Sequence, residues 1–182
     1  MAAIAVQRIQ IYDTGQLAEP DVQAFPEAAS QTYITGAVVI LTSGNVSEAA
    51  NNPATFLGLS IHDAVATYPA NSVAPSASTL FGRTFVGTKL FPGEPGFQHV
   101  LLLHNAQQFE ISLTQAWAAS LVGTTAGLVK DATSGFWVLD NTQTNASCRI
   151  VQKAEGPSSF KGVVGDTFAR VIAIAIGSFL TM

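Results

Sequence analysis

The sequence predicts an all-β protein made of two small β-barrel or β-sandwich domains with an extended N-terminal arm. From residue 32 onward, short apolar segments rich in β-branched residues alternate with clusters of Gly, Asn, Asp and Ser, a spacing typical of β-hairpins. Residues 70–79 are small, polar and contain a proline, so this segment is typical of a linker. We therefore divide the chain into an arm (residues 1–31), a first β domain (32–79, with the linker at 70–79) and a second β domain (80–182).

The N-terminal arm differs in composition from the rest of the chain. Ala, Gln, Pro, Glu and Asp dominate it, and Pro20 and Pro26 interrupt regular structure. Within it, residues 8–12 alternate like a strand, so the arm is either a frayed terminus or a segment that orders against a neighbouring subunit. Its scattered apolar side chains favour the second alternative. The candidate interface residues of the arm are Ile9, Ile11, Tyr12 and Phe25.

In the first β domain the sequence predicts two apolar strands. Residues 33–41 are rich in β-branched side chains and end at a turn cluster, residues 42–45. Residues 55–61 form the second strand, and Gly58 lies inside it. A glycine within a strand indicates a bulge or the close approach of another backbone.

The second β domain contains a longer series of predicted strands. Its last member, residues 170–176, places large side chains on one face and small ones on the other, which is typical of a strand packed on both sides. Residues 115–121 could form one short helix among these strands. The strands are expected at residues 80–86, 98–103, 108–113, 126–130, 136–139, 147–153 and 170–176.

The chain is poor in charge. Eight Lys or Arg and twelve Asp or Glu make 11% of the 182 residues charged, against about 25% in an average soluble domain. Eight basic residues and a net charge of −4 exclude the basic surface that nucleic acid requires, and no apolar run reaches the roughly 20 residues that cross a bilayer. The outer surface is therefore either neutral and polar or covered by other subunits. We expect an isolated monomer to expose more apolar area than is ordinary.

Residues with catalytic chemistry are few. His62 followed by Asp63 could be half of a catalytic triad, but no activated-nucleophile motif accompanies the pair, which favours a loop histidine beside a solvated aspartate. Asp131 and Asp140 flank one hairpin, as the two acids of a glycosidase can, yet acids at turns are mostly turn formers. The sequence thus predicts a protein that is not an enzyme, and a hydrolase using His62 and Asp63 is the less favoured alternative.

The sequence also predicts neither a metal site nor a cofactor. His99 and His104 are five residues apart around a predicted strand and lack the spacing of a helical zinc pair. Cys148 is the single cysteine, so it makes no internal disulfide, and its place in a predicted strand indicates a small buried apolar residue.

Two tryptophans are the remaining candidates for a binding surface. Phe136 and Trp137 are neighbours in a predicted strand, so they point to opposite faces and one of them is expected outside the core. Exposed aromatic side chains suit either a protein interface or a sugar-binding surface. The candidate interface residues of the β domains are Trp117 and Trp137.

The order of glycines and apolar segments forms a pattern along residues 33–176. It runs glycine, apolar strand, turn glycine, valine, alanines and an apolar-Gly-apolar strand, and further strand and turn phrases follow in the second half. The residues that carry it are 36–41, 43–46, 49–50, 56–60 and 62–64, then 109–113, 121–124, 127–128, 130–131, 134–137, 140, 149–151 and 169–172. This pattern resembles the capsid cement and head decoration proteins of tailed bacteriophages. The chain departs from it at residues 70–79 and 91–96.

The resemblance implies a non-enzymatic structural protein on the outer surface of the virion. Proteins of this family bind the capsid lattice, often as trimers at three-fold positions, and clamp neighbouring major capsid subunits after the head expands. It implies the major capsid protein as partner and a homo-oligomer, with a trimer favoured, and neither nucleic acid nor membrane as partner. The alternative function is a virion surface or tail β module that recognises host glycans through Trp117 or Trp137.

Overall fold

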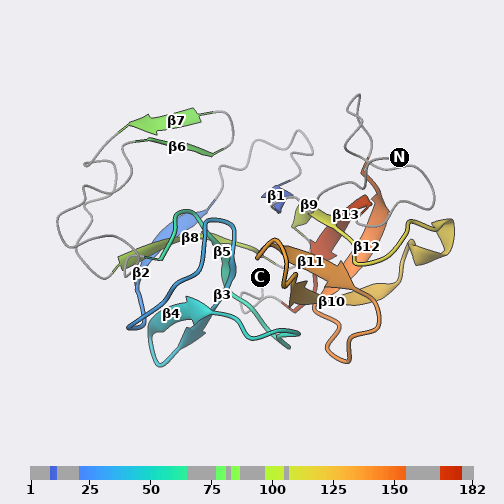
Figure 1. Cartoon of the computed structure of the whole chain (residues 1–182), viewed down its shortest axis with the longest axis horizontal. Helices are drawn as coiled ribbons and strands as arrows, with labels where there is room; N and C mark the ends of the chain where they lie inside the picture. Colours follow the sequence, from blue (N-terminus) through green and yellow to red (C-terminus); the bar gives the residue numbers. More distant parts are fainter. Residues whose placement is uncertain are drawn as a thin grey trace.

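The structure is a computed structural model, and it describes residues 9–11, 21–64, 77–80, 83–86, 97–104, 107–154 and 169–177. The described chain is nearly all β, which confirms the predicted fold class (Figure 1). Its strands are β1 (Gln10–Ile11), β2 (Val22–Pro26), β3 (Val38–Thr42), β4 (Asn45–Glu48), β5 (Gly58–Ser60), β6 (Ala77–Leu80), β7 (Arg83–Val86), β8 (Phe97–Leu102), β9 (Gln108–Ser112), β10 (Thr125–Lys130), β11 (Trp137–Asp140), β12 (Cys148–Lys153) and β13 (Arg170–Ala175).

Helical structure in the described residues is limited to one 3₁₀ turn, η2 (Ala119–Leu121). It lies where the sequence allows a short helix at residues 115–121. No helix of the described part has the length and apolar character needed to cross a lipid bilayer.

One antiparallel sheet has six strands in the order β1-β9-β13-β12-β10-β11. The sheet curls so strongly that β11, its last strand, contacts the residues that directly follow β9. Leu113 and Leu139 form a parallel bridge there, and the Thr114 N–H donates to the Leu139 carbonyl at 2.9 Å. Strands β9 to β13 therefore make a small barrel, with β1 added at the outer edge of β9. β13 lies between β9 and β12 and is buried along almost its whole length, as its side-chain alternation predicts.

A second antiparallel sheet has five strands in the order β2-β8-β5-β3-β4. It closes in a similar way, because Glu27 forms a parallel bridge with Val46 in β4, and the Ala28 N–H donates to the Val46 carbonyl at 2.8 Å. In its middle, a Cβ at Gly58 would overlap with the carbonyl of Leu101 in β8. This confirms the close backbone approach that the interior glycine predicts.

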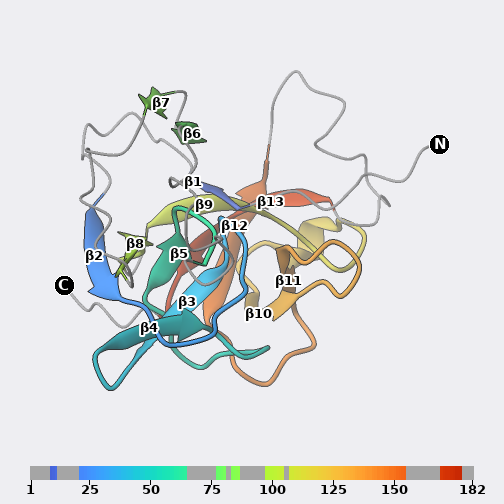
Figure 2. The ribbon, with the colours of Figure 1, turned by 60° about the vertical axis from the view of Figure 1, so that its left-hand side comes forward.

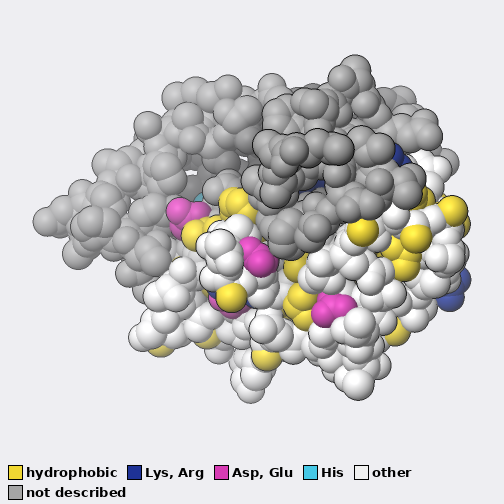
Figure 3. Space-filling model, turned by 45° about the vertical axis from the view of Figure 1, so that its right-hand side comes forward, with side chains coloured by type: hydrophobic (Ala, Val, Ile, Leu, Met, Phe, Trp, Pro, Cys, Tyr) yellow, Lys and Arg dark blue, Asp and Glu magenta, His cyan; other side chains and the backbone are white. Residues whose placement is uncertain are grey.

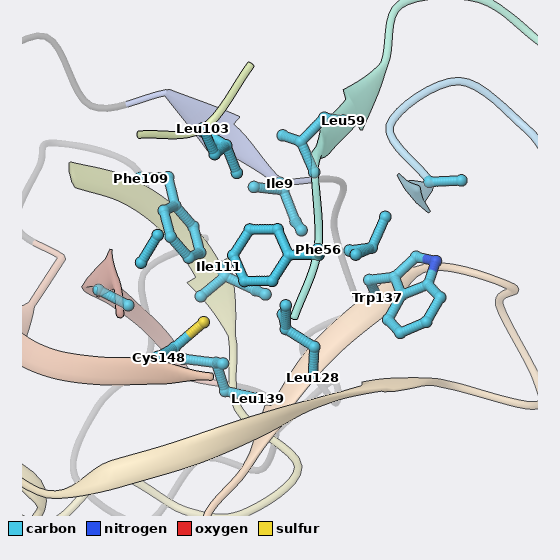
Figure 4. Close-up of a cluster of buried hydrophobic side chains, with 14 of the residues drawn as sticks. Ile9, Phe56, Leu59, Leu103, Phe109, Ile111, Leu128, Trp137, Leu139 and Cys148 are labelled. Atoms are coloured by element: carbon cyan, nitrogen blue, oxygen red, sulfur yellow. The ribbon is translucent and has the colours of Figure 1, made fainter. Parts of the chain in front are cut away.

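The two barrels lie side by side and share one hydrophobic core (Figures 1 and 2). Figure 4 shows Phe56 in the middle of this core, with Ile9 and Leu59 on one side and Ile111 and Leu128 on the other. Phe56 is completely buried. Residues of both sheets therefore belong to one continuous buried cluster.

The N-terminal segment contributes one strand to each barrel. β1 pairs with β9, which places Gln10 opposite Glu110, and β2 pairs with β8, which places Ala24 opposite His99. Pro26 ends β2, the outer strand of the five-stranded order, where a missing N–H is tolerated. Within the described part of the predicted arm, β1 and β2 are therefore strands of the two sheets.

The strand pairing crosses the predicted domain boundary at residues 79 and 80. β8 follows that boundary in the sequence, yet it pairs with β2 and β5 and so completes the five-stranded sheet. Residues 70–76 of the predicted linker lie outside the described residues, and residues 77–79 belong to β6. β6 and β7 form a hairpin outside the two barrels, where the sequence predicts a single strand over residues 80–86 (Figure 1).

Candidate functional site

The loop between β4 and β5 joins the two barrels. The Asn52 N–H donates to the Leu128 carbonyl in β10 at 2.8 Å. Beside it, the Lys130 N–H donates to the side-chain Oδ1 of Asn51 at 2.8 Å. The loop thus occupies hydrogen-bonding positions of β10 that water would otherwise fill.

The Asn52 side chain completes this junction, which we call the asparagine clamp (Asn51, Asn52 and Asn145). Asn52 Nδ2 donates to Thr144 Oγ1 at 3.0 Å, and Asn52 Oδ1 accepts from the Asn145 N–H at 3.2 Å. Asn145 Nδ2 in turn donates to the Asn52 carbonyl at 2.7 Å. Asn52 has a φ of 58°, a left-handed conformation that asparagine adopts more readily than most residues. The clamp fixes one barrel against the other.

Four ionisable side chains form a junction cluster (Glu27, Tyr33, Glu48 and Lys130) next to the clamp. Lys130 Nζ in β10 lies 2.8 Å from Glu48 Oε1 and donates to Oε2 at 3.0 Å, which ties β10 to β4. The Tyr33 hydroxyl donates to Glu27 Oε2 at 2.8 Å. Burial, this hydrogen bond and the charges of Glu27 and Glu48 raise the pKa of Tyr33 far above its ordinary value. Tyr33 therefore acts as a fixed hydrogen-bond donor and not as a base.

A histidine pair is the second polar cluster. His62, in the loop after β5, and His99, in β8, face each other with 3.2 Å between His62 Nε2 and His99 Nδ1. Their ring centres are 5.5 Å apart and the ring planes are inclined at 62°. Burial, followed by the charge of His62, lowers the pKa of His99 from 6.5 to about 4. His99 is therefore neutral at pH 7.

The Asp63 carboxylate is directed to a different residue. Its Oδ1 accepts from the Thr35 N–H at 2.7 Å and from Thr35 Oγ1 at 2.9 Å. The His62 ring meets Asp63 only through the backbone, with 3.1 Å between His62 Nδ1 and the Asp63 carbonyl oxygen. A catalytic triad requires the carboxylate itself on the imidazole, and these two residues do not form that contact.

A buried ion pair links β13 to β9. Arg170 Nε donates to Glu110 Oε1 at 2.7 Å, and Arg170 Nη2 donates to the Glu110 carbonyl at 3.2 Å. Burial lowers the pKa of Arg170, while the Glu110 carboxylate opposes this shift. Because an arginine stays charged in a protein, its burial depends on this partner.

The two aspartates that flank the β10–β11 hairpin stabilise its turns. Asp131 Oδ2 accepts from the Ser134 N–H at 2.7 Å and from Ser134 Oγ at 2.6 Å, and these bonds lower the pKa of Asp131. Burial raises the pKa of Asp140, but hydrogen bonds from Thr142 and Gln143 outweigh it, so the pKa is lowered. Neither carboxyl is held protonated, as a general acid must be.

The hairpin register separates these two carboxylates. Asp140 lies opposite Gly127 at one end of the β10–β11 ladder, while Asp131 follows Lys130 at the other end. Four residues along a strand span about 13 Å, whereas the two acids of a glycosidase are about 5–10 Å apart. The pair therefore lacks the spacing of a glycosidase site.

Every acidic side chain in the described part of the chain has a structural partner. Asp21 has two such partners: its carboxylate accepts from Gln23 Nε2 at 3.3 Å and lies 3.4 Å from His104 Nε2. In the same part of the chain, no three His, Cys, Asp or Glu side chains gather in a way that could hold a metal ion. The acids and their partners are Glu27 with Tyr33, Glu48 with Lys130, Asp63 with Thr35, Glu110 with Arg170, Asp131 with Ser134 and Asp140 with Thr142.

Three of the predicted interface side chains lie in the core. Ile9 and Trp117 are each 8% exposed, and Trp137 is 1% exposed. These side chains pack against the chain itself, and the two tryptophans present no exposed ring to a sugar. The glycan-binding alternative therefore gains no support from them.

The other three predicted interface residues lie in the arm. Phe25 is partly buried against the core. Ile11 lies opposite Phe109 in the pairing of β1 with β9, and Tyr12 lies outside the described residues. Their contact with a partner stays a prediction.

The exposed side chains of the described residues are mainly uncharged, and Ser, Thr, Asn, Gln and Ala are prominent among them. On the described part of the face in Figure 3, hydrophobic side chains form small groups and charged side chains are few, among other side chains and backbone. Val122, at 50%, is the large hydrophobic side chain that is exposed among the described residues. The expectation that an isolated monomer exposes more apolar area than is ordinary stays a prediction.

Local sequence patterns predict neither the asparagine clamp nor the histidine pair. Asn52 and Asn145 are 93 residues apart, and His62 and His99 are 37 residues apart, so local patterns do not connect them. Two adjacent asparagines before Pro53 signal a turn, but not its partner. Cys148, by contrast, is completely buried as predicted, and burial raises the pKa of its thiol to about 12.

Comparison with known proteins gives little further information. No family model matches the chain, and no curated protein matches it. Among solved structures, the chain is similar to the crystal structure of the bacteriophage phi29 gene product 12 C-terminal fragment, with 13% sequence identity and a TM-score of 0.36 over 85% of this chain and 98% of that chain. A likeness this weak assigns no function.

Proposed function

We propose that the chain is a structural protein of a tailed-bacteriophage virion, which binds the outside of the capsid and stabilises the expanded head by clamping adjacent major capsid subunits. The observation that carries the proposal is the use of its polar side chains. Every described carboxylate is engaged within the chain, in a turn, an ion pair or the junction between barrels. This use of polar groups supports a rigid binding body rather than a reaction centre.

Rigidity suits a protein that clamps other subunits. The barrels share a core and are joined by the asparagine clamp, so their relative orientation is set before binding. A preorganised body loses less conformational entropy when it binds. If it binds the expanded lattice and not the unexpanded one, it stabilises the expanded state by mass action.

The surface and the expected symmetry support the same partner. A neutral polar surface suits contact with a protein shell and gives no electrostatic attraction for nucleic acid. A homotrimer would match the three-fold positions of a capsid lattice. The resemblance carried by residues 33–176 supports this class of protein, and the arm is the proposed contact with a sister subunit or the capsid.

Binding to purified heads tests the proposal. The recombinant chain is added to expanded heads that lack it and, in parallel, to unexpanded proheads of the same phage. We expect saturable binding at symmetric positions on expanded heads, visible by electron microscopy, and a higher disruption temperature. We expect no such gain for proheads.

A truncation that removes residues 1–8 serves as the matched variant, because it leaves β1 and Ile9 in place. Weaker binding with unchanged folding would assign part of the contact to the arm. Absence of binding to expanded heads by the full chain would overturn the proposed function.

A further inference from the structure

The histidine pair lies where the chain leaves and re-enters the five-stranded barrel. The chain leaves after β5, forms the β6–β7 hairpin and returns at β8. Two hydrogen bonds hold the exit loop, residues 61–64, against β8. The Ile61 N–H donates to the His99 carbonyl at 3.0 Å, and Gln98 Nε2 donates to the His62 carbonyl at 2.9 Å.

The neighbouring groups assign the ring protons of the two histidines. His62 Nδ1 faces the Asp63 carbonyl oxygen, which can only accept, so this nitrogen carries a proton. In neutral His62, Nε2 is then an acceptor. It faces the His99 N–H at 3.4 Å and His99 Nδ1 at 3.2 Å. His99 Nδ1 therefore carries the proton that is donated between the rings.

The two rings meet head-on. The ring centres are 5.5 Å apart and the facing nitrogens are 3.2 Å apart. The difference between these distances is about twice the distance from an imidazole centre to its nitrogen. Both nitrogens therefore lie near the line that joins the two ring centres. Two imidazoles that bind one metal ion instead point at a position off this line, about 2.0–2.1 Å from each nitrogen. The geometry is that of one proton shared by two rings.

We propose that His62 and His99 form a proton-operated clasp, which holds the loop of residues 61–64 on β8 near neutral pH and releases it in acid. Protonation of both rings, which takes two added protons, turns His62 Nε2 from an acceptor into a donor. Two N–H groups and two positive charges then face each other across 3.2 Å. Because Asp63 in this loop anchors Thr35, release of the loop also weakens the segment that leads into β3.

The described elements around the pair supply little charge to offset this repulsion. β2 has Ala24 opposite His99 and contains no ionisable side chain, and β5 contains none either. The Asp63 carboxylate is bonded to Thr35. The contact of His104 with Asp21 lies beyond the other end of β8.

The sign of the pH dependence follows from the pKa of His99. Its pKa is about 4 in the closed structure and about 6.5 when the ring is free, so the open form binds more protons between these values. The clasp is fully stable above pH 6.5 and weakens as the pH falls toward 4. Between pH 7.5 and pH 5.0 the open fraction rises about 30-fold.

Amide hydrogen exchange on the full chain at pH 7.5 and pH 5.0, corrected for intrinsic rates, tests the clasp. The Ile61 amide reports its opening, and the Gly123 amide, which donates to the Ile150 carbonyl in the other barrel, is the internal reference. We expect the protection of Ile61 to fall about 30-fold relative to Gly123. His104→Gln should keep this pH dependence, whereas His99→Gln should remove most of it.

Two results would overturn the clasp. The first is a combination of two observations. The protection of Ile61 relative to Gly123 is the same at both pH values, and the His99 ring of the wild-type chain titrates near 6.5 in NMR spectra. The other is stronger Ile61 protection when Zn²⁺ alone is added at pH 7.5, which would make the pair a metal site. The ring titration needs no variant, so it decides the matter even if His99→Gln does not fold.

Discussion

Asn52 combines a left-handed backbone with side-chain hydrogen bonds to the opposite barrel. Its φ of 58° turns the loop, and its amide then reaches Thr144 and Asn145. Few residues satisfy both demands. Glycine adopts the left-handed conformation but has no side chain to form the hydrogen bonds. Alanine also lacks these hydrogen bonds, and it is strained in the left-handed conformation.

Substitutions at Asn52 should separate these two contributions. We expect Asn52→Ala to lower the free energy of unfolding by about 2–3 kcal/mol, from lost hydrogen bonds and backbone strain. Asn52→Gly should cost about 1 kcal/mol less than Asn52→Ala. Urea unfolding measures both. Asn45→Ala is the control, because exposed Asn45 makes one long hydrogen bond, 3.4 Å to the Ser43 carbonyl. Equal losses for Asn45→Ala and Asn52→Ala would contradict the role of the clamp.

At the scale of the strands, β5 holds the five-stranded barrel together although it has only three residues. It pairs with β3 on one side and β8 on the other, and all three residues are buried. Gly58 allows β8 to approach, since any Cβ there would overlap with the Leu101 carbonyl. A backbone carbonyl within a ladder cannot move aside as a flexible side chain can.

Gly58→Ala should therefore be severely destabilising. We expect a loss of more than about 2 kcal/mol, because either β8 shifts or the β5–β8 pairing breaks. Gly44→Ala calibrates the experiment: its Cβ meets nothing within 4 Å, but its φ of 81° costs about 1 kcal/mol. Thermal unfolding followed by circular dichroism measures both variants. If the Gly58→Ala chain is as stable as the Gly44→Ala chain, then β5 and β8 can accommodate a Cβ atom at position 58.

Strand prediction from the sequence succeeds where alternation is undisturbed and fails where a single residue redirects the chain. The strands β8 to β13 lie within one residue of their predicted bounds at nearly every end. In contrast, the strand expected from residue 33 begins at Val38, because Gly36 adopts a φ of 84° and turns the chain. β2 was missed because Pro26 reads as a strand breaker, although the end of an outer strand tolerates proline.

The candidate site was less predictable than the strands. The sequence singles out His62, Asp63, Asp131 and Asp140. In the structure, Asp63 accepts hydrogen bonds from Thr35, and Asp131 and Asp140 accept hydrogen bonds within their own turns. The partner of His62 is His99, which depends on β8 lying beside β5. A contact of this kind depends on the fold as a whole, so no local pattern could reveal it.

For the whole molecule, the shared core decides how the barrels unfold. Phe56 sits among residues of both sheets, and the asparagine clamp and the Glu48–Lys130 ion pair cross the same junction. Opening one barrel would expose core side chains of the other. Barrels that share a core in this way should unfold as one cooperative unit.

Unfolding followed by two probes should therefore give one transition. Tryptophan fluorescence reports the six-stranded barrel through buried Trp137 in β11, and the NMR resonance of His99 reports the five-stranded one. We expect coincident urea midpoints at pH 7.5. Labelling of the buried Cys148 thiol should begin at the same urea concentration. Two separated midpoints would instead show independently stable domains with a boundary between them.

The single strand that the N-terminal segment gives to each barrel has a consequence for synthesis. Gln10 in β1 pairs with Glu110, so its partner leaves the ribosome about 100 residues, or about 5–20 s, after it does. Ala24 in β2 likewise waits for His99. β1 and β2 are thus synthesised well before the strands they pair with, and during that interval they have no partner strand on their own nascent chain.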